Sequence, residues 1–274
     1  MTKPFLKSLI VVSMMTLLGA CVAEKKLTLT ATDKGTFSFP SPRSYWNGRN
    51  IDLVGKLEFP EKVQGKVPAM VIIHGSAGQG SRDYTWAKYF REQGVASFMV
   101  DYYSTRGMSR GGAGGPKNPY DLTGAVKFLS THPKIDASKI GTIGFSRGGS
   151  IVMSTLRISE REFGGKKPVL NVNLYGSCVG NTIDRETTDA PILIIIGDQD
   201  DLQPVSLCTG MGEDGKRAGK NIRVHVMPGG THAFDDDKSG TVPFGGKTVR
   251  ISSSSRLAAQ AREIVGAAMA EAFK

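Results

Sequence analysis

The feature that most constrains the fold of this chain is a series of short apolar runs separated by amphipathic segments. The runs span residues 69–73, 96–100, 140–143, 170–174 and 192–196. Short apolar runs of this kind are typical of strands in a parallel sheet that is buried on both faces. Between and after the runs, apolar side chains recur at steps of three and four residues in residues 84–93, 122–129 and 255–273, which is the spacing of a helix face. The alternation predicts an α/β domain: a doubly wound, mostly parallel sheet with helices on both faces.

Two segments before these runs follow a different pattern. Residues 36–39 and 51–59 alternate apolar and polar side chains, as half-buried strands do, and they predict an antiparallel N-terminal edge to the sheet. The chain has 274 residues, 39% of them hydrophobic, which suits a single α/β domain. We assign that domain to residues 36–274.

The N-terminus has the pattern of an export signal. Lys3 and Lys7 are followed by 13 residues without a charge, 8–20, a stretch shorter than the roughly 20 apolar residues that span a bilayer. It ends in Leu17-Leu18-Gly19-Ala20-Cys21, which resembles the bacterial lipobox, where a small residue precedes a cysteine that is lipidated and becomes the new N-terminus. We predict a signal peptide over residues 1–20 and a lipidated Cys21 with a tether over residues 21–35.

This resemblance implies an exported bacterial lipoprotein that is anchored to the membrane at its periplasmic face. Val22 follows Cys21 where inner-membrane lipoproteins carry aspartate, so in a Gram-negative organism the outer membrane is implied. The alternative is ordinary signal-peptidase cleavage, with Cys21 incidental. The basic residues, which give a net charge of +10, are scattered through the sequence. No basic run with interleaved aromatics is present, so no nucleic-acid partner is expected.

Two further cysteines, Cys178 and Cys208, remain in the domain. In an oxidising compartment an even pair is a disulfide candidate, and two buried free thiols are the alternative. Neither cysteine has a histidine or another cysteine at metal-ligand spacing, so no metal site is predicted.

The run at residues 140–143 leads into Gly144-Phe145-Ser146-Arg147-Gly148 and then into a segment that can continue as a helix. A Gly-x-Ser-x-Gly sequence between a strand and a helix holds the serine in a strained, accessible turn, and the glycines let strand and helix approach closely. We predict that Ser146 is a nucleophile. The alternative is a glycine-rich connection of no catalytic meaning.

A serine nucleophile needs a general base that is oriented by a third group. His232 lies in a loop just after the strand-like residues 222–227, where the last member of such a triad is expected, and it is the predicted base. The other histidines are expected to be structural or exposed: His225 within that strand, His74 shaping a loop, and His132 exposed in a connection.

The acid should follow the run at residues 192–196, which ends in Gly197-Asp198-Gln199-Asp200-Asp201-Leu202-Gln203-Pro204. Asp200 fits the pattern Gly-x-x-Asp with proline four residues later, and it is the predicted orienting acid. Asp198 and Asp201 are expected to cap the turn or face solvent, and either is the alternative acid. The chain order serine, acid, histidine is that of an α/β-hydrolase.

Developing charge on a substrate oxygen needs fixed N–H donors. The run at residues 69–73 ends in His74-Gly75-Ser76-Ala77-Gly78, which looks like the oxyanion loop of this fold. We predict that the donors are the backbone N–H groups of Ser76 and of Arg147, the residue after the nucleophile.

With these residues in place, the chain resembles the dienelactone hydrolase family of α/β-hydrolases over residues 50–272. The motifs that carry the resemblance are Phe59-Pro60, His74-Gly75, Asp101-Tyr102-Tyr103, Gly144-x-Ser146-x-Gly148, Gly197-Asp198-Gln199-Asp200 with Pro204, and His232-Ala233-Phe234. Similar family members often carry cysteines near positions 178 and 208, which implies that the two are paired. The resemblance also places Arg106 near a substrate-carboxylate-binding arginine, although its glycine-rich loop is equally compatible with a solvent-exposed rim.

Two departures from the family pattern bear on the substrate. The founding enzymes use a cysteine nucleophile and carry a glutamate in the oxyanion loop, where this chain has Ser146 and Gly75. The resemblance therefore implies a serine hydrolase that cleaves small to medium carboxylic esters through an acyl-enzyme on Ser146, without a metal or organic cofactor. The alternatives are a peptidase or amidase of the same fold and a catalytically inactive lipoprotein that binds a ligand.

Overall fold

A computed structural model describes residues 29–274. The predicted signal peptide, the lipidation site Cys21 and the first part of the tether lie outside the described residues. Across residues 29–274, no helix is both long and apolar enough to span a bilayer.

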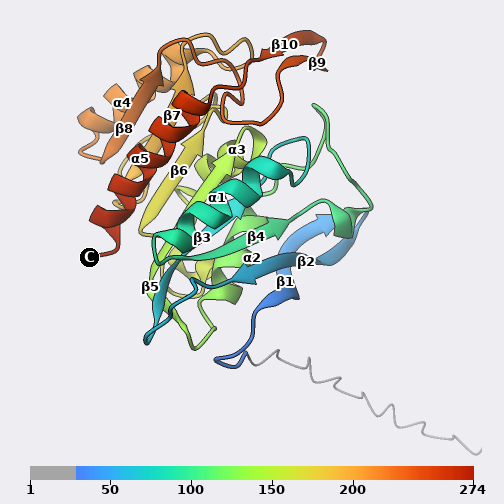
Figure 1. The fold of residues 1–274 in the computed structure, drawn as a ribbon, viewed down its shortest axis with the longest axis vertical. Helices are drawn as coiled ribbons and strands as arrows, with labels where there is room; N and C mark the ends of the chain where they lie inside the picture. The colour runs from blue at the N-terminus through green and yellow to red at the C-terminus, as the bar shows by residue number, and fades with distance from the viewer. Residues whose placement is uncertain (1–28) are drawn as a thin grey trace, which may run out of the picture.

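Within these residues the chain forms an eight-stranded sheet with the strand order β1-β2-β4-β3-β5-β6-β7-β8 (Figure 1). The strands are β1 (Gly35–Trp46), β2 (Arg49–Glu58), β3 (Val67–Ile73), β4 (Ala96–Asp101), β5 (Ile135–Phe145), β6 (Leu170–Leu174), β7 (Ile192–Gly197) and β8 (Ile222–Met227). β2 pairs antiparallel with both β1 and β4, and all pairs from β4 to β8 are parallel. The predicted α/β fold with an antiparallel N-terminal edge is confirmed.

Helices cover both faces of the sheet. They are α1 (Ser81–Glu92), α2 (Pro119–Leu129), α3 (Arg147–Thr155), α4 (Val205–Arg217) and α5 (Ser255–Ala272), with short 3₁₀ turns η1 (Ser104–Arg106) and η2 (Glu160–Phe163). Figure 1 shows α1 and α5 on the viewer's face of the sheet. Successive side chains of β3 point to opposite faces: Val71 packs in the cluster that holds α2 and α3, and Ile72 packs in the cluster that holds α1 and α5. This two-sided burial explains why β3 carries no polar alternation.

Two of these helices begin at side-chain caps. Asn118 caps α2, because its side chain accepts a hydrogen bond from the Tyr120 backbone N–H and Pro119 occupies the first helical position. Ser254 caps α5 through a hydrogen bond from the Leu257 backbone N–H. Each cap satisfies a backbone donor that the helix itself leaves unpaired.

A two-stranded hairpin that the sequence analysis did not predict lies between the His232 loop and α5. Its strands are β9 (Gly240–Phe244) and β10 (Lys247–Ile251), and they pair antiparallel with each other, separately from the main sheet. Figure 1 shows this hairpin at one end of the molecule.

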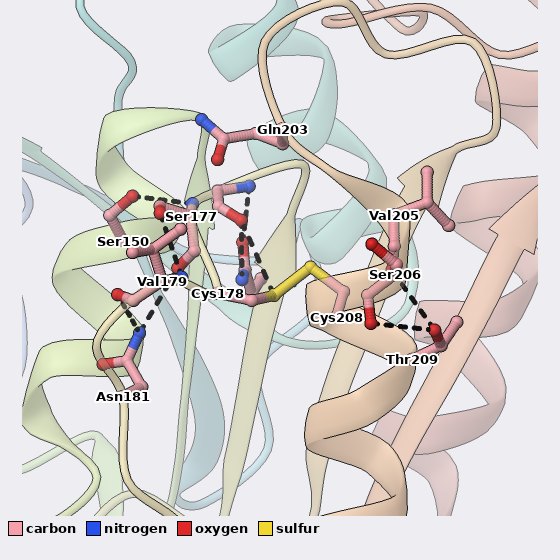
Figure 2. The surroundings of a disulfide bond; sticks show 12 residues. Ser150, Ser177, Cys178, Val179, Asn181, Gln203, Val205, Ser206, Cys208 and Thr209 are labelled. Carbon is pink, nitrogen blue, oxygen red and sulfur yellow. Dashed lines mark hydrogen bonds between the residues drawn. A yellow bond between two sulfur atoms is a disulfide. The ribbon is translucent and has the colours of Figure 1, made fainter.

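The disulfide prediction is confirmed, and the alternative of two free thiols is wrong. Cys178, in the loop after β6, is bonded to Cys208 in α4 with an S–S distance of 2.06 Å (Figure 2). Both cysteines are buried, in a cluster with Ile194 and Met211. The bond joins the loop after β6 to α4, the helix that follows the Asp200 loop.

Removal of this disulfide is expected to lower the free energy of unfolding by roughly 3 to 4 kcal/mol, because the bond closes a loop of about 30 residues in the unfolded chain. The measurement is urea denaturation of a Cys178→Ala/Cys208→Ala variant, in which the buried positions stay apolar. A reducing agent should lower the stability of the wild type by a similar amount and leave the variant unchanged. A variant as stable as the oxidised wild type would contradict this expectation.

Candidate active site

Ser146 occupies the sharp turn between β5 and α3. Its backbone has φ 52° and ψ −113°, a conformation that is costly for a residue with a Cβ and that is common at functional sites. The flanking glycines make the turn possible, since a Cβ on Gly144 would overlap the Gly148 carbonyl and one on Gly148 would overlap the Ile73 carbonyl. The Ser146 backbone N–H donates to the Leu174 carbonyl at 2.9 Å, which ties the turn to β6.

The structure brings Ser146 together with His232 and Asp200. His232 Nε2 lies 2.9 Å from Ser146 Oγ, and His232 Nδ1 lies 2.9 Å from Asp200 Oδ2. The carboxylate can only accept, so Nδ1 carries the proton and Nε2 is free to accept the serine hydroxyl proton. The Asp200 side chain is fully buried and that of His232 nearly so. The three groups thus form a continuous hydrogen-bonded chain from a hydroxyl through an imidazole to a buried carboxylate.

The Asp200 carboxylate is positioned by its own loop. Its Oδ1 atom accepts hydrogen bonds from the backbone N–H groups of Leu202 at 2.8 Å and Gln203 at 2.9 Å, which leaves Oδ2 to face His232. The two alternative acids are engaged elsewhere. Asp198 accepts from the Gly229 backbone N–H at 2.7 Å, and Asp201 accepts from the Arg250 backbone N–H at 3.1 Å.

A second carboxylate, which the sequence analysis missed, anchors the loop that carries His232. Asp235 accepts hydrogen bonds from the Tyr175 hydroxyl at 2.6 Å and from Trp86 Nε1 at 2.8 Å. Burial raises the pKa of the Tyr175 phenol well above its ordinary value, so the hydroxyl stays protonated and acts as a donor. The Tyr175 ring also packs edge-on against the His232 imidazole, with the centroids 5.1 Å apart.

A cavity of about 230 Å³ opens over Ser146. Ser146, His232 and Ser76 all line it. Ser76 therefore lines the same cavity as Ser146, in the loop predicted to supply an oxyanion donor. Arg147 begins α3, where backbone N–H groups have no partner within the helix. Within residues 29–274, no cluster of three or more His, Cys, Asp or Glu side chains is arranged to hold a metal ion.

Comparison with known proteins places this chain in a family. The model of the dienelactone hydrolase family matches residues 54–274, which is most of the chain. This protein belongs to the dienelactone hydrolase family.

Two curated proteins are similar to this dienelactone hydrolase family member in sequence. Protein usf of Aquifex pyrophilus is 26% identical over 188 residues, which cover 62% of this chain and 78% of that protein. Polyketide transferase ATR5 of Stachybotrys chlorohalonatus is 33% identical over 113 residues, but the match covers only 38% of this chain and 35% of that protein.

Solved structures share the fold at low sequence identity. The dienelactone hydrolase-like promiscuous phosphotriesterase P91 from metagenomic libraries has a TM-score of 0.69 at 16% identity, covering 86% of this chain and 98% of that one. Esterase 2 of Thermogutta terrifontis, solved with butyrate bound, has a TM-score of 0.60 at 16% identity, covering 86% and 94%. A putative dienelactone hydrolase from Klebsiella pneumoniae has a TM-score of 0.63 at 17% identity, covering 86% and 98%.

In this family member the Arg147 side chain connects two loops of the site. Its Nε donates to Ser76 Oγ at 2.9 Å, and its Nη2 donates to the Ala113 carbonyl at 3.0 Å. The same guanidinium also donates to the carbonyls of Gly112 and Gly115. The sequence analysis assigned a role only to the Arg147 backbone, whereas its side chain holds the predicted oxyanion loop against the glycine-rich segment at residues 111–115.

The prediction that Arg106 binds a substrate carboxylate is wrong. The Arg106 side chain is fully buried, and it donates to Asp121 Oδ1 at 2.9 Å and to the Tyr102 carbonyl. A buried guanidinium needs such compensation, and it is neither at the cavity nor on an exposed rim. The arginines that do line the cavity are Arg82 and Arg110.

The other histidines lie outside the reacting group. His74 stacks on Tyr102, with the ring centroids 4.1 Å apart, and its Nδ1 donates to the Gly75 carbonyl at 2.8 Å. Burial lowers the pKa of His74. His225 is half-buried in β8.

The expectation that His132 is exposed is wrong. Only 1% of it is exposed, because its Nε2 donates to the Asp33 carbonyl at 2.9 Å and its ring packs on Phe59.

Proposed function

We propose that the protein is a serine hydrolase that cleaves small to medium carboxylic esters through an acyl-enzyme on Ser146. The observation that carries the proposal is the unbroken contact from Ser146 Oγ through His232 to Asp200, with both links at 2.9 Å, at the edge of a cavity. Membership of a hydrolase family and structural likeness to esterases support an ester as the substrate.

In the first half of the proposed reaction, His232 Nε2 takes the hydroxyl proton of Ser146 as Oγ attacks the carbonyl carbon of the ester. The backbone N–H groups of Ser76 and Arg147 stabilise the negative oxygen of the tetrahedral intermediate. The intermediate then expels the alcohol, which takes the proton from His232 and leaves an acyl group on Ser146. Asp200 holds the imidazole in the required tautomer and stabilises its protonated form.

In the second half, a water molecule attacks the acyl carbon and gives its proton to His232. Collapse of the second intermediate breaks the bond to Ser146 Oγ, which takes the proton back as the carboxylic acid leaves. The enzyme returns to its starting state, and the sum is ester plus water giving acid plus alcohol. No metal or organic cofactor takes part in the proposed steps.

The test is the intact mass of the full chain in detergent after treatment with a fluorophosphonate, with Ser146→Ala as the control. One adduct that is absent from the variant supports an activated serine. No adduct on folded wild-type protein overturns the mechanism and favours a lipoprotein that only binds its ligand. Turnover of p-nitrophenyl acetate and of the matching p-nitroanilide then separates an esterase from an amidase, because a peptidase or amidase would cleave the anilide at a comparable rate.

We also propose, from the N-terminal sequence, that the protein is an exported lipoprotein anchored through Cys21. The disulfide between Cys178 and Cys208 supports an oxidising compartment. Mass spectrometry of the N-terminal peptide is expected to show a lipid-modified Cys21, and Cys21→Ala is expected to move the protein from the membrane fraction to the soluble one. An unmodified cysteine, or a wild-type protein that is already soluble, would contradict the anchor.

A further inference from the structure

The hairpin of β9 and β10 lines the cavity over Ser146 with apolar side chains. Val242, Pro243 and Phe244 come from β9, and Val249 and Ile251 come from β10. Val242 and Val249 face each other across the two strands. Lys247 and Arg250, the charged residues of β10, do not line the cavity. We refer to the five apolar residues as the hairpin wall.

The hairpin wall is tied to the loops that carry the predicted catalytic residues. The Arg250 backbone N–H donates to Asp201 Oδ2 at 3.1 Å, directly beside Asp200. The Ser252 backbone N–H donates to Thr231 Oγ1 at 2.8 Å, directly beside His232. The wall therefore has a defined position relative to the nucleophile.

The turn of the hairpin meets the opposite rim of the cavity. A Cβ placed on Gly245, at this turn, would lie 3.8 Å from the Ala113 side chain. Ala113 belongs to the glycine-rich segment that the Arg147 guanidinium holds. The hairpin is thus supported at its base by the catalytic loops and at its tip by this segment.

One of the two arginines that line the cavity, Arg82, is already paired within the protein. Arg82 lies 3.6 Å from Asp236 and 3.4 Å from Asp83, and its guanidinium stacks over the Phe145 ring at 4.6 Å. In the hairpin wall, Val249 is buried and Ile251 packs against the core, whereas Val242, which also lines the cavity, is 41% exposed. An apolar surface that is fixed beside a reactive group suits an apolar part of a ligand.

We propose that the hairpin wall binds an uncharged hydrocarbon group of the ester and makes the enzyme selective for esters that carry one. This inference rests on the proposed esterase function and adds the class of substrate. Burial of each further methylene group against the wall should raise kcat/KM about fourfold until the cavity is filled. The hydrocarbon belongs either to the acyl group or to the alcohol, and the experiment separates the two.

The experiment uses the full chain in detergent and two series of substrates. The acyl series is p-nitrophenyl acetate, butyrate and hexanoate, and the alcohol series is ethyl, butyl and hexyl acetate. The variants are Phe244→Ala, which removes a large side chain from the wall, and Val242→Thr, which keeps the shape of the side chain and replaces one methyl group with a hydroxyl. The control is Val226→Thr on β8, because Val226 is a strand valine of similar exposure, 37%, that does not line the cavity.

The expected result is a preference of the wild type for the longer member of one series. Phe244→Ala should lower the ratio of kcat/KM for the six-carbon to the two-carbon substrate about tenfold or more, and Val242→Thr about fivefold, whereas Val226→Thr leaves the ratio unchanged. If the variants lose the chain-length preference in the acyl series, the acyl group binds the hairpin wall; if they lose it in the alcohol series, the alcohol does. Val242→Thr keeps the test valid if Phe244→Ala fails to fold.

Two failures remain distinguishable through fluorophosphonate labelling of the same preparations. The hairpin wall proposal is overturned, while the esterase function stands, if labelled wild type hydrolyses esters with no dependence on chain length in either series. The same holds if the wall variants lower kcat/KM for short and long substrates by the same factor. If the folded wild type is not labelled and hydrolyses no ester, the proposed function itself has failed.

Discussion

Replacement of Ser146 by alanine is expected to lower kcat for ester hydrolysis by roughly 10⁴- to 10⁶-fold, because the covalent route needs the hydroxyl that contacts His232. The residual rate would come from the cavity and the backbone donors, which the substitution leaves in place. Alanine meets about the same backbone cost as serine at a φ of 52°, so the turn should keep its shape. Steady-state kinetics on purified protein measure the effect.

The matched control for this variant is Ser154→Ala. Ser154 lies on α3, and its hydroxyl donates only to the Ser150 carbonyl, at 2.8 Å. Its removal should change kcat less than about threefold. If Ser146→Ala kept more than a tenth of the wild-type kcat while it remained folded, Ser146 would not be the nucleophile.

Asp200→Asn is expected to lower kcat about 10⁴-fold, the second large effect. The asparagine oxygen can still accept the backbone N–H groups of Leu202 and Gln203, so the loop keeps its contacts. The asparagine NH₂ group would then face His232 Nδ1, and two donors cannot pair. The imidazole is forced into the tautomer with the proton on Nε2, which can no longer accept the proton of Ser146.

The neighbouring acids provide the controls for Asp200→Asn. Asp198→Asn and Asp201→Asn should each retain kcat within about threefold, because both side chains accept from backbone N–H groups away from His232. Measurement of kcat for the three variants decides which carboxylate orients the base. A large loss in Asp198→Asn, with Asp200→Asn near wild type, would reverse the assignment.

The parts of the fold that were predicted from the sequence are those with a strong local signal. β3 and β7 carry apolar residues on both faces, so the sequence alone indicates that both strands are buried. α4 was not predicted, since Gly210, Gly212 and Gly215 weaken its helical pattern. In the structure, Gly212 and Gly215 give α4 close contact with Val224 and Ile222 of β8, a tertiary reason that local propensity does not contain.

In the candidate site too, the residues with a local sequence signal were predicted and those that depend on tertiary contacts were not. Ser146, Asp200 and His232 were predicted because each lies just after a strand, and the topology of the sheet brings such loops to one edge. The orientation of a side chain within a loop has no such signal, and Arg106 therefore was assigned to the substrate although it turns inward to Asp121. The contact of Asp235 with Trp86 joins residues 149 positions apart, and it depends on how α1 packs beside the His232 loop.

The guanidinium of Arg147 contacts the glycine-rich segment only through main-chain carbonyls, those of Gly112, Ala113 and Gly115. Carbonyls are common to all amino acids, so this attachment does not depend on which side chains the segment carries. A substitution at position 113, whose side chain lies near the hairpin turn at Gly245, can therefore change that contact while the attachment to the predicted oxyanion loop is kept. Arg147, next to the predicted nucleophile Ser146, would therefore hold this segment in place while its side chains change.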